Sequence, residues 1–129
     1  MSHIVYDTGA LIAAAKNDQA FLHQHYRMLG RGKIPVIPAG VLAQGWDARP
    51  KAAGLHRLLH GCEVMPLTGT LAKAAAVLCQ KNKSSDAIDA SVVLTSIAHD
   101  EAPIFTDDLG DIRALVECAG RKRIRVERP

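Results

Sequence analysis

The chain is poor in aromatic residues and lacks any long apolar run. Phe, Trp and Tyr make up only 4% of its 129 residues, and Trp46 is the single tryptophan. An aromatic surface that stacks bases, as in RNA-recognition and single-strand-binding modules, is therefore not indicated. No apolar run approaches the ~20 residues of a membrane span. The first residues, up to Asp7, carry no basic segment of the kind that opens a signal peptide. We expect a soluble, cytoplasmic protein without a membrane segment.

Paired cysteines are also missing. Cys62, Cys79 and Cys118 are odd in number, far apart and in no C-x-x-C spacing. This usage predicts reduced thiols in the core of an intracellular protein, rather than a disulfide framework or a zinc site.

The remaining composition is that of an ordinary globular protein, with 48% hydrophobic and 22% charged residues. The length predicts a single domain, residues 1–129. The formal charge is +3, and many of the acids gather in two short runs, at 86–89 and 107–111. A basic protein with a local cluster of acids is what a metal-dependent enzyme acting on a polyanion would need. Charged helix faces and a solvated tail would explain the same charges.

Short β-rich runs alternate with helical stretches along the chain, without repeats or linkers. Strands are expected near 4–6, 34–37, 63–65, 103–106 and 124–126. Helices are expected near 10–16, 18–29, 38–46, 51–60, 68–80, 84–99 and 109–118. Pro35 favours the first turn of its strand or a sheet edge, and Ser84 or Ser85 is the expected cap of the sixth helix. This alternation predicts an α/β fold, a three-layer sandwich with a mostly parallel five-stranded sheet.

In such a sheet, sites form at the carboxyl ends of the strands. Asp7 follows the first expected strand, and Asp107 and Asp108 follow the fourth. Asp86 and Asp89 begin the helix before the fourth strand, three residues apart, and can share a helix face. If strands one and four are neighbours, these carboxylates converge. A cluster of like charges recruits cations, and all-oxygen ligation suits Mg²⁺ or Mn²⁺.

Each acid also has a simpler interpretation. Asp86 fits a helix N-terminal acid that complements the helix dipole, and Asp89 fits the same role. Asp7 fits a turn residue after its strand. At least one of Asp107, Asp108 and Asp111 is expected to be a helix N-terminal acid without a ligand role. Acids nevertheless stand at three places that can converge: after the first strand, after the fourth strand and at the start of the helix between them. Together they still favour metal-dependent phosphodiester hydrolysis.

Three segments together resemble the acidic motifs of PIN-domain ribonucleases. They are Asp7-Thr8-Gly9-Ala10-Leu11-Ile12, Asp89-Ala90-Ser91-Val92-Val93 and Thr106-Asp107-Asp108-Leu109-Gly110-Asp111-Ile112. The segment from Pro38 to Trp46 resembles the helix after strand two in the VapC-type toxins of bacterial, particularly actinobacterial, toxin–antitoxin pairs. The resemblance spans essentially the whole chain, in order and spacing.

The resemblance implies a PIN-like fold and a Mg²⁺- or Mn²⁺-dependent endoribonuclease, the toxin of a type II toxin–antitoxin system. The implied metal ligands and catalytic residues are Asp7, Asp89 and Asp108. The implied supporting residues are Asp86, Asp111, Thr8, Thr106 and Gln44. The implied partners are an RNA substrate and a cognate antitoxin, and such proteins are often homodimers.

Gln44 departs from the family pattern, which usually has a glutamate there. The loss of one negative charge leaves a second function open, a PIN-fold module that binds RNA or an antitoxin without cleavage. Other classes fit less well. A phospho-acceptor receiver domain needs an aspartate after the third strand, where Met65-Pro66-Leu67 stand, and a haloacid-dehalogenase-type phosphatase needs an acid at Gly9.

The histidines suggest little. His56 and His60 have the spacing of a zinc pair but no evident third ligand, and Arg57 stands where a zincin has its glutamate. His23 and His25 are expected to be solvated.

Overall fold

The computed structural model describes residues 2–84 and 86–129. Within them, five strands form one sheet in the order β3-β2-β1-β4-β5, and all four strand pairs are parallel. The strands are β1 (Ser2–Tyr6), β2 (Lys33–Pro38), β3 (Glu63–Met65), β4 (Ile104–Phe105) and β5 (Val126–Glu127). The predicted α/β class is confirmed, as is the adjacency of the first and fourth strands.

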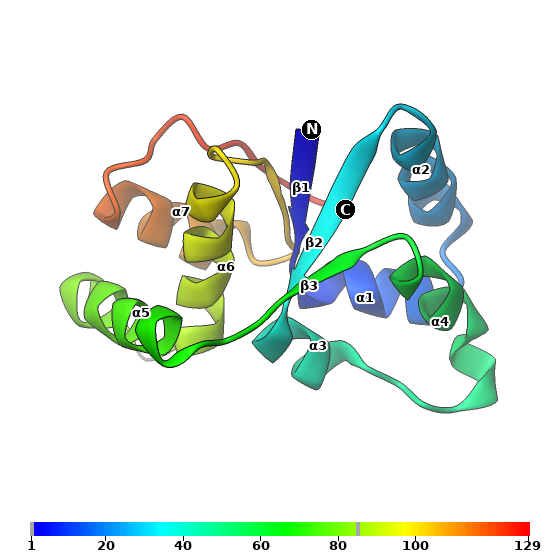
Figure 1. Ribbon diagram of the computed structural model, residues 1–129, viewed down its shortest axis with the longest axis horizontal. Coiled ribbons are helices and arrows are strands. Elements are labelled where there is room, and N and C mark those ends of the chain that lie inside the picture. The colour runs from blue at the N-terminus through cyan, green and yellow to red at the C-terminus, as the bar shows by residue number, and fades with distance from the viewer. Residues whose placement is uncertain (1, 85) are drawn as a thin grey trace.

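Helices cover both sides of this sheet (Figure 1). One layer contains α5 (Gly69–Asn82), α6 (Ala87–Ala98) and α7 (Leu109–Cys118). The other contains α1 (Thr8–Ala15), α2 (Gln19–Gly30) and α4 (Ala53–Leu59), with the short 3-10 helix η1 (Pro50–Ala52) before α4. In the part of the chain that the structure describes, no helix has the length and apolar character that crossing a membrane requires.

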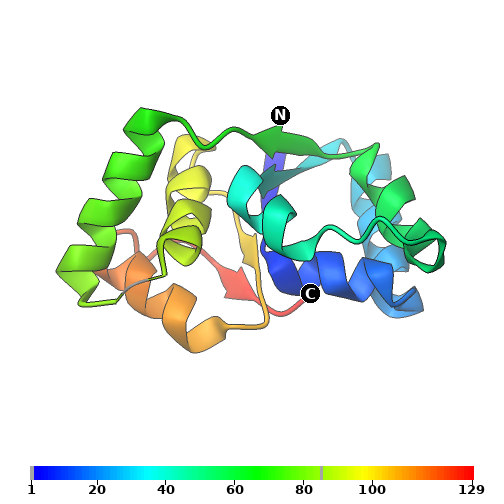
Figure 2. The same cartoon turned by 90° about the horizontal axis from the view of Figure 1, so that it is seen from below.

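The remaining α-helix, α3 (Ala39–Gly45), begins directly after β2 and contacts both α1 and α6. In the view from below, it lies at the carboxyl end of the sheet, close to the start of α1 (Figure 2). It therefore borders the place where the sequence predicts a site.

The core is centred on β1 because both faces of this strand are covered. Ile4, Val5 and Tyr6 are buried, as expected for a central parallel strand, which is apolar on both faces. Tyr6 stacks on Phe105 of the neighbouring strand, with ring centroids 5.9 Å apart. This packing holds the ends of β1 and β4 side by side. It therefore also brings together Asp7, which follows β1, and Asp107 and Asp108, which follow β4.

Pro35 was expected near the start of its strand or at a sheet edge. It is the third residue of β2, near the start of the strand, but β2 is an interior strand, so the sheet edge is wrong. The register explains why a proline is tolerated there. β2 pairs with β1 from Lys33 onward, but it pairs with β3 only from Val36. At Pro35 the strand has a neighbour on one side only, and the missing N–H interrupts no ladder on the open side.

Two helix starts have the predicted cap, and two are corrected. Asp18 accepts a hydrogen bond from the Phe21 N–H, and Thr68 accepts one from the Leu71 N–H. The sixth helix is capped by Asp86 and not by Ser84, because the Asp86 carboxylate reaches the Asp89 N–H. The alternative cap, Ser85, lies outside the described residues.

The second correction concerns Pro38. It is the last residue of β2 and precedes α3 rather than standing in the first turn, because its backbone is still extended, with ψ 140°.

Candidate active site

The predicted acids meet in one pocket at the carboxyl end of the sheet. Asp7 follows β1, Asp107 and Asp108 follow β4, and Asp86 and Asp89 begin α6. All five line a pocket of about 260 Å³, together with Thr8, Gly9, Ile12, Gln44 and Thr106. We refer to it as the acidic pocket. The two adjacent strands and one helix N-terminus therefore bring together residues up to about a hundred positions apart.

Asp7 is held by hydrogen bonds on both of its oxygens and is only 5% exposed. Its Oδ1 accepts from the Thr8 N–H at 2.8 Å, which caps α1. Its Oδ2 accepts from the Thr106 hydroxyl at 2.6 Å. The same hydroxyl accepts from the Asp108 N–H at 3.0 Å. Thr106, fully buried, thus joins the end of β1 to the start of α7.

Asp89 lines the pocket from the first turn of α6 and is only 8% exposed. Burial, and after it the negative charges of Asp86, Asp7 and Asp108, together raise its pKa to about 7. The carboxylate is thus strained electrostatically when it is ionised, and a bound cation would relieve that strain.

Three carboxylates have ligand oxygens within 4.8 Å of one another: Asp89, Asp108 and Asp111. Asp111 was expected only as a supporting residue, and the charge of Asp108 raises its pKa. Asp7 lines the same pocket and acts on Asp89 through its charge. An oxygen-only donor set with excess negative charge is what Mg²⁺ and Mn²⁺ prefer, so the residues present fit such an ion.

Three further residues shape the pocket. Thr8 donates its hydroxyl proton to Gln44 Oε1 at 2.9 Å, which links α1 to α3. Gly9 lies close to Asp107: a Cβ atom at position 9 would stand 2.5 Å from Asp107 Oδ2, so a larger residue there would displace the exposed Asp107 side chain. The predicted supporting residues Thr8, Gln44, Asp86 and Thr106 therefore all lie at the pocket.

A larger, basic groove adjoins the acidic pocket. It has a volume of about 780 Å³ and shares Ile12 and Gln44 with the pocket. Its lining includes Lys16, Arg49, Lys51 and Trp46. The Trp46 side chain is 44% exposed and stacks on His56, with centroids 4.8 Å apart.

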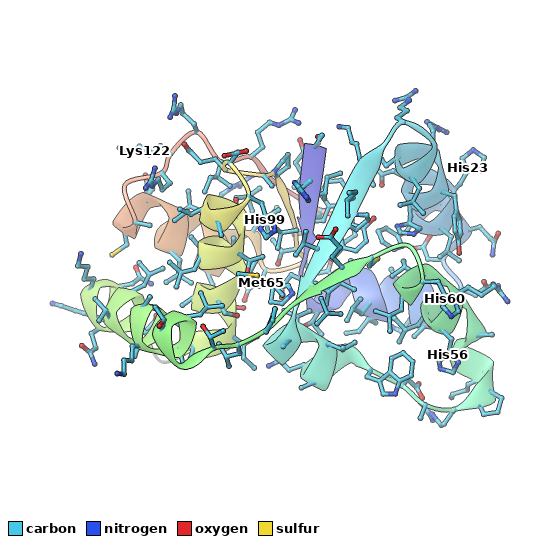
Figure 3. The ribbon with its side chains drawn as sticks, in the orientation of Figure 1. His23, His56, His60, Met65, His99 and Lys122 are labelled. Atoms are coloured by element: carbon cyan, nitrogen blue, oxygen red, sulfur yellow. The ribbon has the colours of Figure 1, made fainter. Side chains whose placement is uncertain are left out.

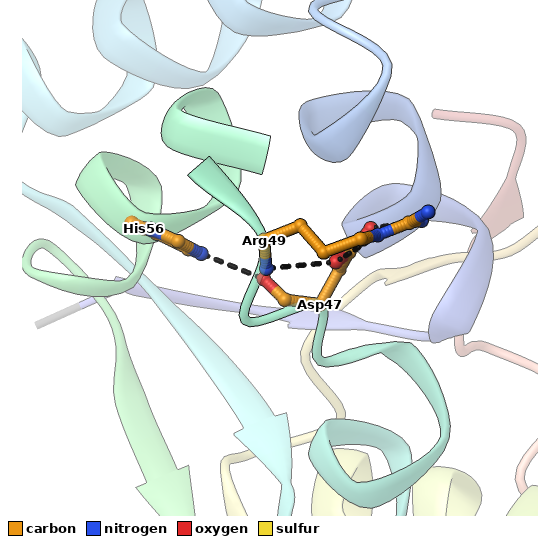
Figure 4. Close-up of polar contacts among 3 residues, drawn as sticks. All are labelled: Asp47, Arg49 and His56. Carbon is orange, nitrogen blue, oxygen red and sulfur yellow. Dashed lines mark hydrogen bonds and ion pairs between the residues drawn. The ribbon is translucent and has the colours of Figure 1, made fainter. Parts of the chain in front are cut away.

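One acid moderates the charge of this groove. Asp47 pairs with Arg49 at 2.7 Å, and its backbone carbonyl oxygen lies 2.6 Å from His56 Nε2 (Figure 4). The hydrogen bonds from Arg49 hold the pKa of Asp47 well below its usual range. Within residues 2–84 and 86–129, Lys16 and Lys51 form no ion pair of this kind.

Sequence reasoning missed this groove, although it grouped Arg49 with Lys51. Lys16, the residue that ends α1, follows Ile12 by four residues, a spacing that puts both on one side of the helix and could have indicated the groove. The segment 46–52, which supplies most of the remaining lining, has no periodic pattern from which its course could be predicted.

The expectation that His25 is solvated is wrong. His25 is fully buried in α2, and its Nδ1 lies 2.8 Å from the Tyr6 hydroxyl. Burial lowers its pKa to about 4. His56 contacts Asp47 and Trp46 instead of forming a metal site with His60. The three cysteines are free, as expected, and Cys79 is buried.

Comparison with known proteins shows the fold. No family model and no curated protein matches the sequence. A solved structure does match, described as VapBC2 from Rickettsia felis bound to a DNA fragment from their promoter. The superposition has a TM-score of 0.66 and 14% sequence identity, and it covers 98% of each chain. The fold is PIN-like. At this identity the likeness establishes the three-layer architecture over the whole chain, and activity has to be argued from the site.

Proposed function

We propose that this protein is a Mg²⁺- or Mn²⁺-dependent endoribonuclease and the toxin component of a type II toxin–antitoxin pair, acting in the cytoplasm. The observation that carries the proposal is the convergence of five aspartates in a small pocket that opens beside a basic groove. A carboxylate cluster alone serves many purposes, but a polyanion needs both parts: cations for its phosphates, and a metal site for the bond that is cut.

In this proposal Asp7, Asp89 and Asp108 hold the metal ion and are the catalytic residues. Asp111 and Asp86 add negative charge around them, and Thr106 fixes Asp7 and Asp108 through its two hydrogen bonds. When bound, Mg²⁺ or Mn²⁺ supplies water activation and neutralises charge on the phosphodiester. Gln44, which accepts a hydrogen bond from Thr8, would orient a water through its amide group.

The substrate's backbone would lie along the basic groove. Lys16, Lys51 and Arg49 are the cations that face its phosphates. Trp46 offers one exposed aromatic surface for a base. With a single such ring, binding depends mainly on charge and on the shape of the RNA.

The partner follows from the same likeness. The matched structure is described as VapBC2 bound to a DNA fragment from their promoter, and the motifs of this chain resemble those of the VapC-type toxins, which pair with an antitoxin. We infer that this chain has a cognate antitoxin of its own and forms a homodimer in that assembly. Co-purification of a protein encoded beside it, at a defined ratio, would support the inference; isolation of the chain only as a free monomer, even when its neighbour is co-expressed, would contradict it.

The enzymatic proposal is tested by cleavage of a structured RNA pool. Purified protein is incubated with Mn²⁺ or Mg²⁺, with EDTA, and as the variants D7N, D89N and D108N. Cleavage by the wild type that is lost in EDTA and in each variant is expected. E117Q, which removes an exposed carboxylate on α7, is the matched control and should cleave normally. Equal cleavage by D108N and wild type would overturn the proposal.

A second function is favoured by one observation, the glutamine at position 44. In a non-cleaving module that only binds RNA or an antitoxin, the acidic pocket would hold no ion. Calorimetric titration with Mn²⁺ separates the two functions, because only the nuclease should show binding that disappears in D89N and D108N.

A further inference from the structure

A second group of metal-ligating side chains lies at the opposite end of the sheet from the acidic pocket. His3 of β1, Glu63 of β3 and His99, the residue that ends α6, have ligand atoms within 4.8 Å of one another. Figure 3 shows His99 at the end of α6 beside β1, well separated from His23, His56 and His60. Since α6 begins at the acidic pocket, the ten residues from Asp89 to His99 place the two groups about 15 Å apart along the helix.

The parallel register brings these three side chains to one face of the sheet. His3 is aligned with Ile34 on β2, and Glu63 is aligned with Val36 on the same strand. Ile34 and Val36 are two residues apart and so point to the same face. His3 and Glu63 therefore flank β2 on the side that α6 covers, and His99, at the end of α6, lies close to both. The fold itself assembles the group.

The hydrogen bond of His99 favours the tautomer that binds a metal through Nε2. Its Nδ1 lies 2.7 Å from the backbone carbonyl oxygen of Thr95. A carbonyl oxygen can only accept a hydrogen bond, so Nδ1 carries a proton, and in the neutral ring the free lone pair is on Nε2. Metal-bound histidines show this same arrangement, in which the second ring nitrogen donates to a carbonyl and fixes the ring. The His3 ring lies beside it, with centroids 4.8 Å apart.

The donor set and its surroundings select the type of ion. Two imidazoles and one carboxylate are ligands for Zn²⁺ and related transition metals, with a fourth position left for water, whereas Mg²⁺ requires oxygen ligands. The carboxyl end of α6 adds a partial negative charge next to the site. Tetrahedral coordination at Zn–ligand distances of about 2.0–2.1 Å needs the ligand atoms roughly 3.4 Å apart. The three ligand atoms lie within 4.8 Å of one another and Glu63 is exposed, so a small side-chain adjustment brings them into this range.

We propose that His3, Glu63 and His99 form a transition-metal site, distinct from the acidic pocket, that binds Zn²⁺ or an ion of similar chemistry. Such an ion would tie the short edge strand β3 to β1 and to the end of α6. Its binding would stabilise the folded chain, because the three ligands are brought together only by folding.

The test is calorimetric titration of Zn²⁺ into protein that carries no histidine purification tag. The protein also carries D108N, so that the acidic pocket does not contribute to binding. One ion per chain is expected. H3Q and E63Q should each weaken binding at least tenfold, and H23Q, at an exposed histidine of α2, should bind as the parent does. H99Q should also lose binding. Because H99Q removes the hydrogen bond to Thr95, thermal unfolding of each metal-free variant shows whether its fold is intact.

Cobalt provides an independent readout of the ligands. Co²⁺ added to the parent should give the visible absorption of a four-coordinate site, and H3Q and E63Q should abolish it while H23Q retains it. Zn²⁺ should also raise the melting temperature of the parent and not that of H3Q. If H3Q and E63Q bind Zn²⁺ as the parent does, or if the parent binds none, the site does not exist.

Discussion

Gln44 is the residue on which the balance between cleavage and simple binding depends. Its side-chain oxygen is engaged by Thr8, and it borders both the acidic pocket and the basic groove. A glutamate at this place would add a negative charge facing the other carboxylates, which a divalent cation would balance.

Substitution Q44E should therefore raise the affinity for Mn²⁺ by roughly tenfold or more, which is about 1.4 kcal/mol. In the metal-free protein the same change should lower stability, since it adds a like charge. Calorimetry with Mn²⁺ measures the affinity. Q80E, which adds the same charge on the exposed face of α5, is the matched control; an equal effect of both variants would show that only net charge matters.

His25 makes the stability of the fold depend on pH. Its pKa is about 4 in the folded chain, against 6.5 for an ordinary histidine. Between these values the unfolded chain binds a proton and the folded chain does not. The contribution of His25 is therefore complete above pH 6.5 and falls as the pH is lowered toward 4, by at most about 3 kcal/mol.

Urea unfolding of the wild type and H25F across this pH range measures the effect. Asp89 acts with the opposite sign over part of the same range, because its pKa is raised to about 7. Asp89 is present in both proteins, so its effect cancels in the difference between the free energies of unfolding of the wild type and H25F. This difference should shrink as the pH falls. H23F, an exposed change on the same helix, should leave the wild-type slope unaltered; parallel curves for H25F and the wild type would contradict the assignment.

At the scale of the elements, the site depends on how the ends of β1, β4 and α7 are joined. Thr106 makes this connection with one hydroxyl group, which donates to Asp7 and accepts from the Asp108 N–H. The group is fully buried, so water cannot replace it.

Substitution T106V keeps the shape of the side chain and removes both hydrogen bonds. It should lower the free energy of unfolding by about 1–3 kcal/mol, because a buried carboxylate oxygen and an N–H lose their partner. RNA cleavage should fall much further than stability explains, since Asp7 and Asp108 are no longer fixed. T106S restores the hydroxyl and should recover most of the activity; no recovery would mean that the methyl group, and not the hydroxyl, matters.

The elements also show what could be predicted from sequence. The buried apolar runs at 4–6 and 104–105 marked the central strands, and the acids after them marked the carboxyl edge. Asp18 and Thr68 could be predicted as caps because a cap is a local interaction, in which a side chain accepts a hydrogen bond from the N–H three residues later.

Features that depend on contacts between distant segments were not predictable in this way. His25 is buried because α2 packs against Tyr6, and no local pattern around His25 indicates that. The basic groove needs the course of the segment 46–52, which is set by the stacking of Trp46 on His56 and by the Asp47–Arg49 pair. The group of His3, Glu63 and His99 needs the sheet register and the position of the end of α6.

For the molecule as a whole, charge is arranged so that a small acidic pocket is attached to a basic groove. In the absence of metal the pocket destabilises the fold, because Asp89 must ionise beside Asp86, Asp7 and Asp108. Above pH 7 the metal-free D89N variant should therefore be more stable than the wild type, by about 1 kcal/mol or more. Thermal unfolding with and without Mn²⁺ tests this: the ion should stabilise the wild type and leave D89N unchanged. A metal-free D89N that melts below the wild type would contradict it.

The groove predicts RNA binding that weakens with salt. Each phosphate neutralised by a cation contributes about −0.7 to the slope of log affinity against log salt for a single strand. Neutralising Lys16 and Lys51 together, in K16Q/K51Q, should reduce that slope by roughly 1.4. K81Q, which removes a positive charge on α5 outside the groove, is the control. Filter binding with D108N protein measures affinity without cleavage, and an unchanged slope in K16Q/K51Q would place the RNA elsewhere.

The central claim is that the acidic pocket cuts RNA with the help of a divalent ion. The most direct measurement is the rate of cleavage of one labelled RNA as Mn²⁺ is titrated, for the wild type and D89N side by side. We predict a rate that rises to a plateau with Mn²⁺ for the wild type, and a loss of at least a hundredfold in D89N, equivalent to about 2.7 kcal/mol. A well-folded wild type that cleaves no faster than D89N at any Mn²⁺ concentration would contradict the claim.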